Sequence, residues 1–361
     1  MSLMPRPGVL EVEPYVGGEA VIAGRNRVIR LASNENPLGA SPQARAAYLA
    51  HAEDLHRYPD GGARLLREAI AETHGLDPDR IVCGAGSDEL IALLTRVYAG
   101  EGDEVLHSAH GFLMYAISAK SAGAIAVPAP ERDLTADVDA LLSRVSTKTR
   151  LLFLANPNNP TGSYLPTAEI ARLREALPRE VLLVIDAAYA EYVEAEDYEP
   201  GRALVEARDD VVMLRTFSKI HGLASLRLGW AYGPPAVADV LHRVRGPFNV
   251  SMAAQEAGAA AMRDREHVAR SRSHNAAALA RFTERCAALG LETAPSVGNF
   301  LLIRFPSELG RDAAAALAHL KAEGILVRAM GGYGLPDCLR ITIGTDEDMA
   351  AVAEALEAFR S

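Results

Sequence analysis

Cysteine is scarce in this chain. Its 361 residues include only Cys83, Cys286 and Cys338, which lie far apart and form no Cys-x-x-Cys spacing. Thiols placed in this way are typical of reduced, mostly buried side chains and argue against a disulfide framework or a zinc site. We therefore expect no disulfide and no bound metal.

Long apolar runs and blocks of basic residues are also missing. The chain has no run of the roughly 18 apolar residues that a membrane span requires, and residues 1–8 lack the features of a secretory signal. We expect a cytoplasmic protein. The net charge of −10 and the pI near 5.5 argue against nucleic acid or an anionic membrane as a partner. Any anion must therefore be bound by a local group of residues.

Strand-like and helix-like segments alternate along most of the chain, which is typical of an α/β fold. Continuous apolar strands at residues 151–154 and 181–185 predict a sheet that is covered on both faces and binds ligands beyond the carboxyl ends of its strands. We expect an N-terminal arm in residues 1–40, a large domain in residues 41–245 and a small C-terminal domain in residues 246–361.

A lysine and an arginine follow one of these apolar segments closely. Residues 211–214 predict a buried strand, which ends in Thr216 and Ser218 before Lys219, and Arg227 begins the next apolar run. A desolvated lysine becomes an amine nucleophile, while hydroxyls beside an arginine can bind a phosphate. This combination suggests pyridoxal phosphate. An isolated Ser-Lys pair is more often an ordinary loop, so the rest of the chain must decide.

A glycine-rich turn at residues 84–86 separates a short strand from a helix that starts near Ser87 and Asp88. The free amide groups and the dipole of a helix start favour a phosphate, and glycines allow it to approach the backbone. An ordinary N-cap formed by Ser87 explains the same residues equally well.

Charged side chains at the ends of other apolar strands also need partners. Asp186 ends the strand at residues 181–185, where a carboxylate requires a cation, an N-cap or a ligand site. Arg328 and Arg340 lie at or in apolar strands, so each guanidinium needs an anion from the protein or from a substrate. The loop at residues 155–162, rich in Asn and Pro, is far more elaborate than a tight turn requires.

Jointly, these motifs resemble the fold-type I pyridoxal-phosphate aminotransferases over nearly the whole chain. Residues 33–39, 57–60 and 339–345 are similar to the histidinol-phosphate aminotransferase family in particular. The resemblance implies a mostly parallel, seven-stranded sheet with helices on both faces, a smaller C-terminal α/β domain and an N-terminal arm. It also implies a homodimer with shared active sites.

The same resemblance implies roles for single residues. Lys219 would form a Schiff base with the cofactor aldehyde and then move the proton, and Asp186 would hold the pyridine nitrogen. Asn159 and Tyr189 would contact the ring oxygen, and Phe112 would stack on the ring. The residues implied around the cofactor phosphate are Ser87, Asp88, Thr216, Ser218 and Arg227, with Tyr58 from the neighbouring subunit. Those implied for the substrate are Arg340, which would bind its carboxylate or phosphate, and Tyr15, Asn34 and Arg328.

One departure from the family pattern occurs at His110-Gly111, where relatives often have Pro-Thr before the stacking aromatic. The expected reaction is ping-pong transamination between L-histidinol phosphate and 2-oxoglutarate. The same scaffold carries aromatic amino-acid and prephenate aminotransferases and a phosphothreonine decarboxylase, which differ in a few pocket side chains. A transcriptional regulator would need a helix-turn-helix domain, whose pattern and basic charge the first eighty or so residues lack.

Overall fold

A seven-stranded sheet forms the centre of the computed structural model, which describes residues 5, 7–15, 17–25 and 27–360. In spatial order its strands are β2 (Ile81–Gly84), β10 (Gly229–Tyr232), β9 (Val211–Thr216), β8 (Leu182–Asp186), β7 (Thr149–Ala155), β3 (Glu104–Ser108) and β4 (Ile125–Ala129). Only β10 runs antiparallel to its neighbours in this sheet. The predicted α/β fold with a mostly parallel sheet is confirmed.

Helices cover both faces of this sheet, because successive side chains of its buried strands point to opposite sides. Leu151 and Phe153 of β7 pack on one face, and Leu152 and Leu154 pack on the other. The first face is covered by α3 (Ser87–Tyr98), α4 (Met114–Ala122) and α8 (Pro235–Val244). The second is covered by α2 (Arg64–His74), α5 (Val138–Ser143), α6 (Thr167–Ala176), α7 (Arg202–Ala207) and α9 (Met252–Arg263), and α1 (Pro42–Ala50) packs on α9.

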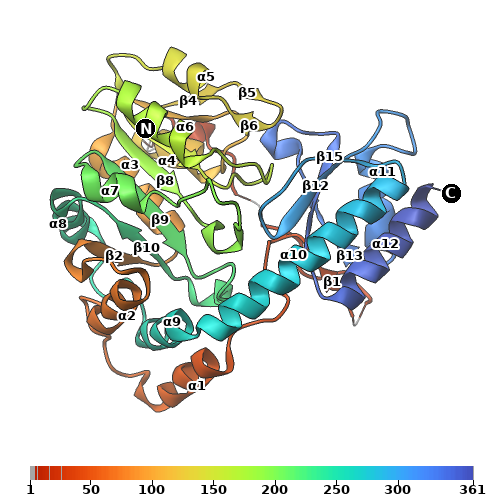
Figure 1. The fold of residues 1–361 in the computed structure, drawn as a ribbon, viewed down its shortest axis with the longest axis horizontal. Helices are drawn as coiled ribbons and strands as arrows, with labels where there is room; N and C mark the ends of the chain where they lie inside the picture. Colours follow the sequence, from red (N-terminus) through yellow and green to blue (C-terminus); the bar gives the residue numbers. More distant parts are fainter. Residues whose placement is uncertain (1–4, 6, 16, 26, 361) are drawn as a thin grey trace, which may run out of the picture.

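A second, smaller unit has its own core. Its antiparallel sheet consists of β11 (Glu292–Thr293), β12 (Phe300–Arg304), β15 (Cys338–Thr342) and β14 (Arg328–Ala329). Its helices are α10 (Arg265–Ala288), α11 (Ala313–Ala322) and α12 (Asp346–Arg360). In Figure 1, α10 runs from the side of α9 across to this unit. The predicted boundary at residues 245/246 stays a prediction, and α9 packs with the core of the large sheet.

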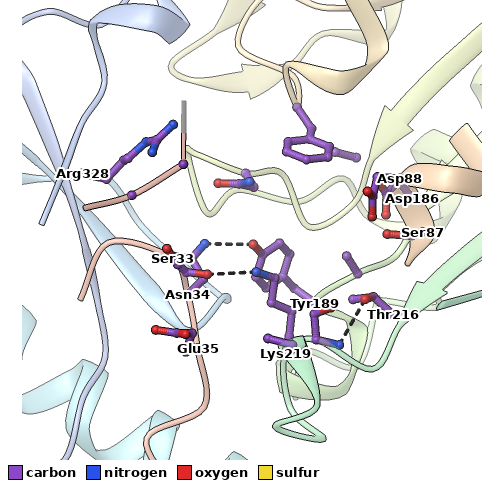
Figure 2. A pocket seen from close by; sticks show the side chains of 18 of the residues that line it. Ser33, Asn34, Glu35, Ser87, Asp88, Asp186, Tyr189, Thr216, Lys219 and Arg328 are labelled. Atoms are coloured by element: carbon purple, nitrogen blue, oxygen red, sulfur yellow. Dashed lines mark hydrogen bonds between the residues drawn. The ribbon is translucent and has the colours of Figure 1, made fainter. Parts of the chain in front are cut away.

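The N-terminal segment is attached to the small unit, because β1 (Ile29–Arg30) pairs in parallel with β13 (Ile325–Leu326). Residues 31–36 then pass between the two units toward the carboxyl ends of β8 and β9 (Figures 1 and 2). Parallel strands end at the same edge of a sheet, so Asp186 and Thr216 come together there. No helix in the described ranges is long and apolar enough to cross a membrane.

Candidate active site

A cavity of about 310 Å³ opens at this edge of the large sheet, between the N-terminal segment and the small unit (Figure 2). Fourteen of the fifteen residues predicted for the site line it, and they come from all three parts of the chain. Tyr58 alone among the predicted residues is not in the lining. The sequence did not single out Ser33, Glu35, Tyr115 or Tyr333, which also line the cavity.

Lys219 follows β9 and its amine lies inside the cavity. Its Nζ donates a hydrogen bond to the backbone oxygen of Ser33 at 3.1 Å and lies 5.7 Å from the centre of the Tyr189 ring. Burial, and then the charge of Arg340, lower the pKa of Lys219 to about 7. A large fraction of the amine is therefore neutral at neutral pH, which is the form that acts as a nucleophile or base.

Asp186 is buried at the end of β8 and leaves one oxygen open. Tyr115 donates its hydroxyl to Asp186 Oδ2 at 2.8 Å, whereas Oδ1 has no hydrogen-bond partner among the described residues. Burial raises the pKa of Asp186 to about 6, and the hydrogen bond from Tyr115 opposes this shift. A buried carboxylate in the lining of a cavity, with one oxygen unpaired, fits the protonated nitrogen of a pyridine ring.

The glycine turn and the start of α3 lie where a phosphate-binding site was predicted. The N-cap of α3 is Gly86, with no side chain capping it within the described chain, so the alternative of Ser87 as the N-cap is wrong. The amide groups of the first turn are thus left for an anion. A Cβ at Gly86 would collide with the side chains of Asp88 and Arg227, which explains the glycine.

Arg227 reaches the same place from the other side of the turn. Its Nη2 donates to Asp88 Oδ1 at 2.6 Å, and its Nη1 donates to Ser218 Oγ at 3.4 Å. The backbone of Arg227 has φ of 50°, a strained conformation for a residue other than glycine, and such strain is typical of functional sites. Thr216 Oγ1 accepts from the amide of Ser218 at 3.1 Å and fixes the turn.

Tyr189 and Asn159, which were predicted to contact the ring oxygen, each form a hydrogen bond with another residue of the site. Asn34 donates its amide to the Tyr189 hydroxyl at 2.9 Å, which leaves the phenol proton free to be donated toward the cavity (Figure 2). Asn34 itself is fixed by Thr342, whose hydroxyl donates to Asn34 Oδ1 at 3.1 Å. Asn159 Oδ1 accepts a hydrogen bond from Arg340 Nη1.

The predicted substrate residues lie at the side of the cavity formed by the small unit. Arg340 is buried on β15, and its Nη2 donates to the backbone oxygen of Ala32 at 2.8 Å. Arg328 lies 5.7 Å from the centre of the Tyr15 ring. Two guanidinium groups at one side of a cavity fit a substrate with an anionic group.

His110, which departs from the family pattern, is bound away from the cavity. Its backbone amide donates to Glu131 Oε1 at 3.0 Å, and its Nδ1 lies 2.9 Å from Glu131 Oε2. Phe112 still reaches the lining and meets Tyr115 edge to face at 6.0 Å. The His-Gly pair therefore does not displace the aromatic residue.

Known proteins are similar to this chain over nearly its whole length. A family model described as aminotransferase class I and II matches residues 26–356. Histidinol-phosphate aminotransferases of Paramagnetospirillum magneticum and Rhodospirillum centenum are 59% and 60% identical to this chain, covering 98% of it and 98% and 97% of those proteins. A crystal structure of histidinol-phosphate aminotransferase from Sinorhizobium meliloti in complex with pyridoxal-5'-phosphate is similar with a TM-score of 0.88 and 30% identity, covering 93% of this chain and 92% of that one. The chain therefore belongs to the class I and II aminotransferases and, within them, to the histidinol-phosphate aminotransferase family.

Proposed function

We propose that this protein uses pyridoxal phosphate to transfer an amino group between L-histidinol phosphate and 2-oxoglutarate, giving imidazole acetol phosphate and glutamate in histidine biosynthesis. The observation that carries the proposal is the joint placement of the Lys219 amine, the open oxygen of Asp186 and the guanidinium of Arg340 in one cavity. The names of relatives at about 60% identity support this choice of substrates.

The residues of the cavity fit this cofactor in three places. Asp186 Oδ1 would hold the ring nitrogen, Tyr189 and Asn159 would hold the ring oxygen, and the seat of α3 and Arg227 would hold the phosphate. When bound, pyridoxal phosphate supplies an aldehyde that links covalently to amines and a ring that takes up an electron pair.

Lys219 is proposed to move the proton. Its amine is the base in the cavity whose lowered pKa lets it accept a proton from the substrate carbon near neutral pH and then release it. The phenol oxygen of Tyr189 already accepts a hydrogen bond from Asn34. The phenol proton is therefore available to be donated to the ring oxygen. Arg340 binds the anionic group of whichever substrate is present, so the donor and the acceptor occupy the same position in turn, as ping-pong kinetics require.

A titration of the purified protein tests the proposed substrate. With pyridoxal phosphate added, the visible absorbance of the lysine-bound cofactor is followed while histidinol phosphate, phenylalanine or glutamate is added separately. We expect half-loss of the band at a histidinol phosphate concentration at least about tenfold below that for phenylalanine, because a phosphate carries more charge than the carboxylate of phenylalanine and can pair with both Arg328 and Arg340.

The reverse order would make the protein an aromatic aminotransferase on the same scaffold. Release of carbon dioxide from added phosphothreonine, in place of transfer of its amino group, would identify the decarboxylase alternative. Absence of a visible band with added cofactor would refute the role of Lys219.

We also propose that the active enzyme is a homodimer in which Tyr58 serves the neighbouring subunit. Tyr58 is 80% exposed and stacks on Phe248 at 4.7 Å, outside the cavity of its own chain. Phe248 has φ of 56°, which is a strained conformation for a bulky residue. Leu49 and Leu55, at 64% and 82% exposure, add apolar surface nearby in the sequence, as a buried interface would use.

Mixing two inactive variants tests this arrangement. Lys219→Ala and Tyr58→Ala homodimers are each expected to have low activity, the second because cofactor phosphate binding is weakened. After reassortment we expect recovery of about a quarter of wild-type activity, since half of the dimers are mixed and each of these has one intact site. No recovery, with subunit exchange verified, would show that Tyr58 does not act across an interface.

The cytoplasmic location is a further proposal. The three cysteines are free and buried in the structure. Reduced thiols and a small-molecule biosynthetic reaction both suit the cytoplasm.

A further inference from the structure

Tyr115 contacts two of the four residues that were predicted to hold the cofactor ring, Asp186 and Phe112. It is the second residue of α4 and is fully buried, with its ring stacked on Phe153 of β7 at 4.8 Å and an interplanar angle of 3°. Its hydroxyl donates to Asp186 Oδ2 at 2.8 Å, and its ring forms a T-shaped pair with the Phe112 ring, with 6.0 Å between the ring centres and 89° between the ring planes. One side chain thus supports the ring-nitrogen contact and the ring-face contact together.

The hydrogen bond from Tyr115 makes the two oxygens of Asp186 unequal. A carboxylate on a freely rotating side chain could offer either oxygen to a ligand. Here Oδ2 is occupied by a hydroxyl that parallel stacking holds in place, and Oδ1 is left without a partner within the described chain. The oxygen that faces the ring nitrogen is therefore selected before the cofactor binds.

We propose, on the basis of the function proposed above, that Tyr115 is a positioning residue that fixes the orientation and the negative charge of the Asp186 carboxylate. It acts through Asp186 and does not need to contact the substrate. The stack on Phe153 is essential to this role, because a hydroxyl on a mobile ring would not hold one oxygen of the carboxylate in place.

The charge of Asp186 depends on several opposing groups. The titratable groups that affect it are Tyr115 from α4, Asp88 from α3, Lys219 from the turn after β9, and Tyr189 and Tyr198 from the segment after β8. Burial, and to a smaller extent Asp88, raise the pKa of Asp186, whereas Tyr115, the amide of Ala188 and Lys219 lower it. Loss of the Tyr115 hydroxyl therefore moves the balance toward the protonated acid.

The test is Tyr115→Phe, which removes one hydroxyl and keeps the stacked ring. We expect kcat to fall about 10- to 100-fold with KM for histidinol phosphate changed less than about threefold, since a hydrogen bond to a charged group is lost and no substrate contact changes. The acid limb of the kcat/KM profile should move to higher pH by about one unit. The pH titration of the visible band of the bound cofactor should shift in the same sense without any turnover.

Tyr192→Phe is the matched control, because Tyr192 is also buried close to the site but its hydroxyl interacts with Asn299 instead. It should leave both pH profiles unchanged. If Tyr115→Phe resembles wild type in kcat and in both profiles, or if the two variants shift alike, the proposal is wrong. A wild-type protein without a visible band or turnover would instead refute the proposed function, so the two failures can be told apart.

A second substitution keeps the test decisive if the phenylalanine variant folds poorly. Fluorotyrosine in place of Tyr115 preserves the shape and makes the phenol a stronger hydrogen-bond donor. The acid limb should then move to lower pH, opposite to the shift expected for Tyr115→Phe. An unchanged profile in the fluorotyrosine protein would contradict the proposed role.

Discussion

Replacing Lys219 by alanine is expected to lower kcat by roughly four orders of magnitude, which is the upper range for loss of a general acid-base residue. The decrease in kcat is larger if covalent attachment of the cofactor also limits the rate. The variant loses both the amine that links to the cofactor and the base in the cavity with a pKa of about 7. Among the described residues the side chain makes one hydrogen bond, to the backbone of Ser33, so folding should be little affected. Stopped-flow assays of kcat and thermal unfolding measure the two effects separately.

Lys321→Ala is the appropriate control, since Lys321 is exposed on α11 and pairs with Glu19 at 2.5 Å away from the cavity. It should keep wild-type kcat. Added small primary amines should partly restore turnover in Lys219→Ala, because the space left by the side chain can admit a free base. Wild-type activity in Lys219→Ala would refute the assignment.

The sheet and the strand-end residues could be predicted because their signals are local. A continuous apolar run such as that of β8 is stable as a strand that is covered on both faces. A carboxylate at the end of this strand must then lie at the ligand-binding edge of the sheet. The same reasoning located Lys219 after β9 and the glycine turn before α3. The assignment of roles to these residues needed the family resemblance, since spacing alone does not distinguish a cofactor lysine from a loop lysine.

Contacts that depend on tertiary packing could not be predicted in this way. Helices α1 and α4 were not predicted, and α4 is the element that brings Tyr115 to Asp186. Tyr115 is separated from Asp186 by 71 positions, and no periodicity in the sequence links the two. Asn34 was predicted as a substrate contact, which stays a prediction, but its observed bond to Tyr189 depends on how the N-terminal segment crosses the site.

A buried ion pair next to the site illustrates the same limit. Glu191 accepts a hydrogen bond from Arg215 at 2.7 Å, and His221 lies 3.7 Å from the same oxygen. Although burial opposes the charge, Arg215 and His221 hold the pKa of Glu191 well below its usual range. The pair links the segment that carries Tyr189 to β9, and His221 extends this contact to the turn that carries Lys219. In the sequence Glu191 is simply an acidic residue among alanines and tyrosines.

Asp186→Asn is expected to lower kcat by about three orders of magnitude while the cofactor still binds through its phosphate and ring oxygen. Asparagine has nearly the same shape and can still accept the Tyr115 hydroxyl, so the packing is kept. Its second atom is then an amide nitrogen, a donor that faces the ring nitrogen. The ring nitrogen can no longer be held protonated by a negative charge, and the ring takes up the electron pair of the substrate less well.

The pH profile separates this electrostatic effect from a loss of structure. A carboxyl group with a pKa of about 6 is charged above that pH and protonated below it. A protonated ring nitrogen beside the carboxylate lowers this pKa. If the charged form is the active one, wild-type kcat/KM must therefore fall at a pH below about 6, and Asp186→Asn must lack that fall.

Asp210→Asn provides the comparison, because Asp210 is also buried but pairs with Arg208 at 2.8 Å and lies just before β9, at the end of that strand remote from the cavity. That variant should lose thermal stability and keep kcat, because it weakens only the ion pairs of Asp210 with Arg208 and Arg174. Asp186→Asn should show the opposite pattern. Retention of more than about a tenth of wild-type kcat in Asp186→Asn would mean that the open oxygen is not what holds the ring nitrogen.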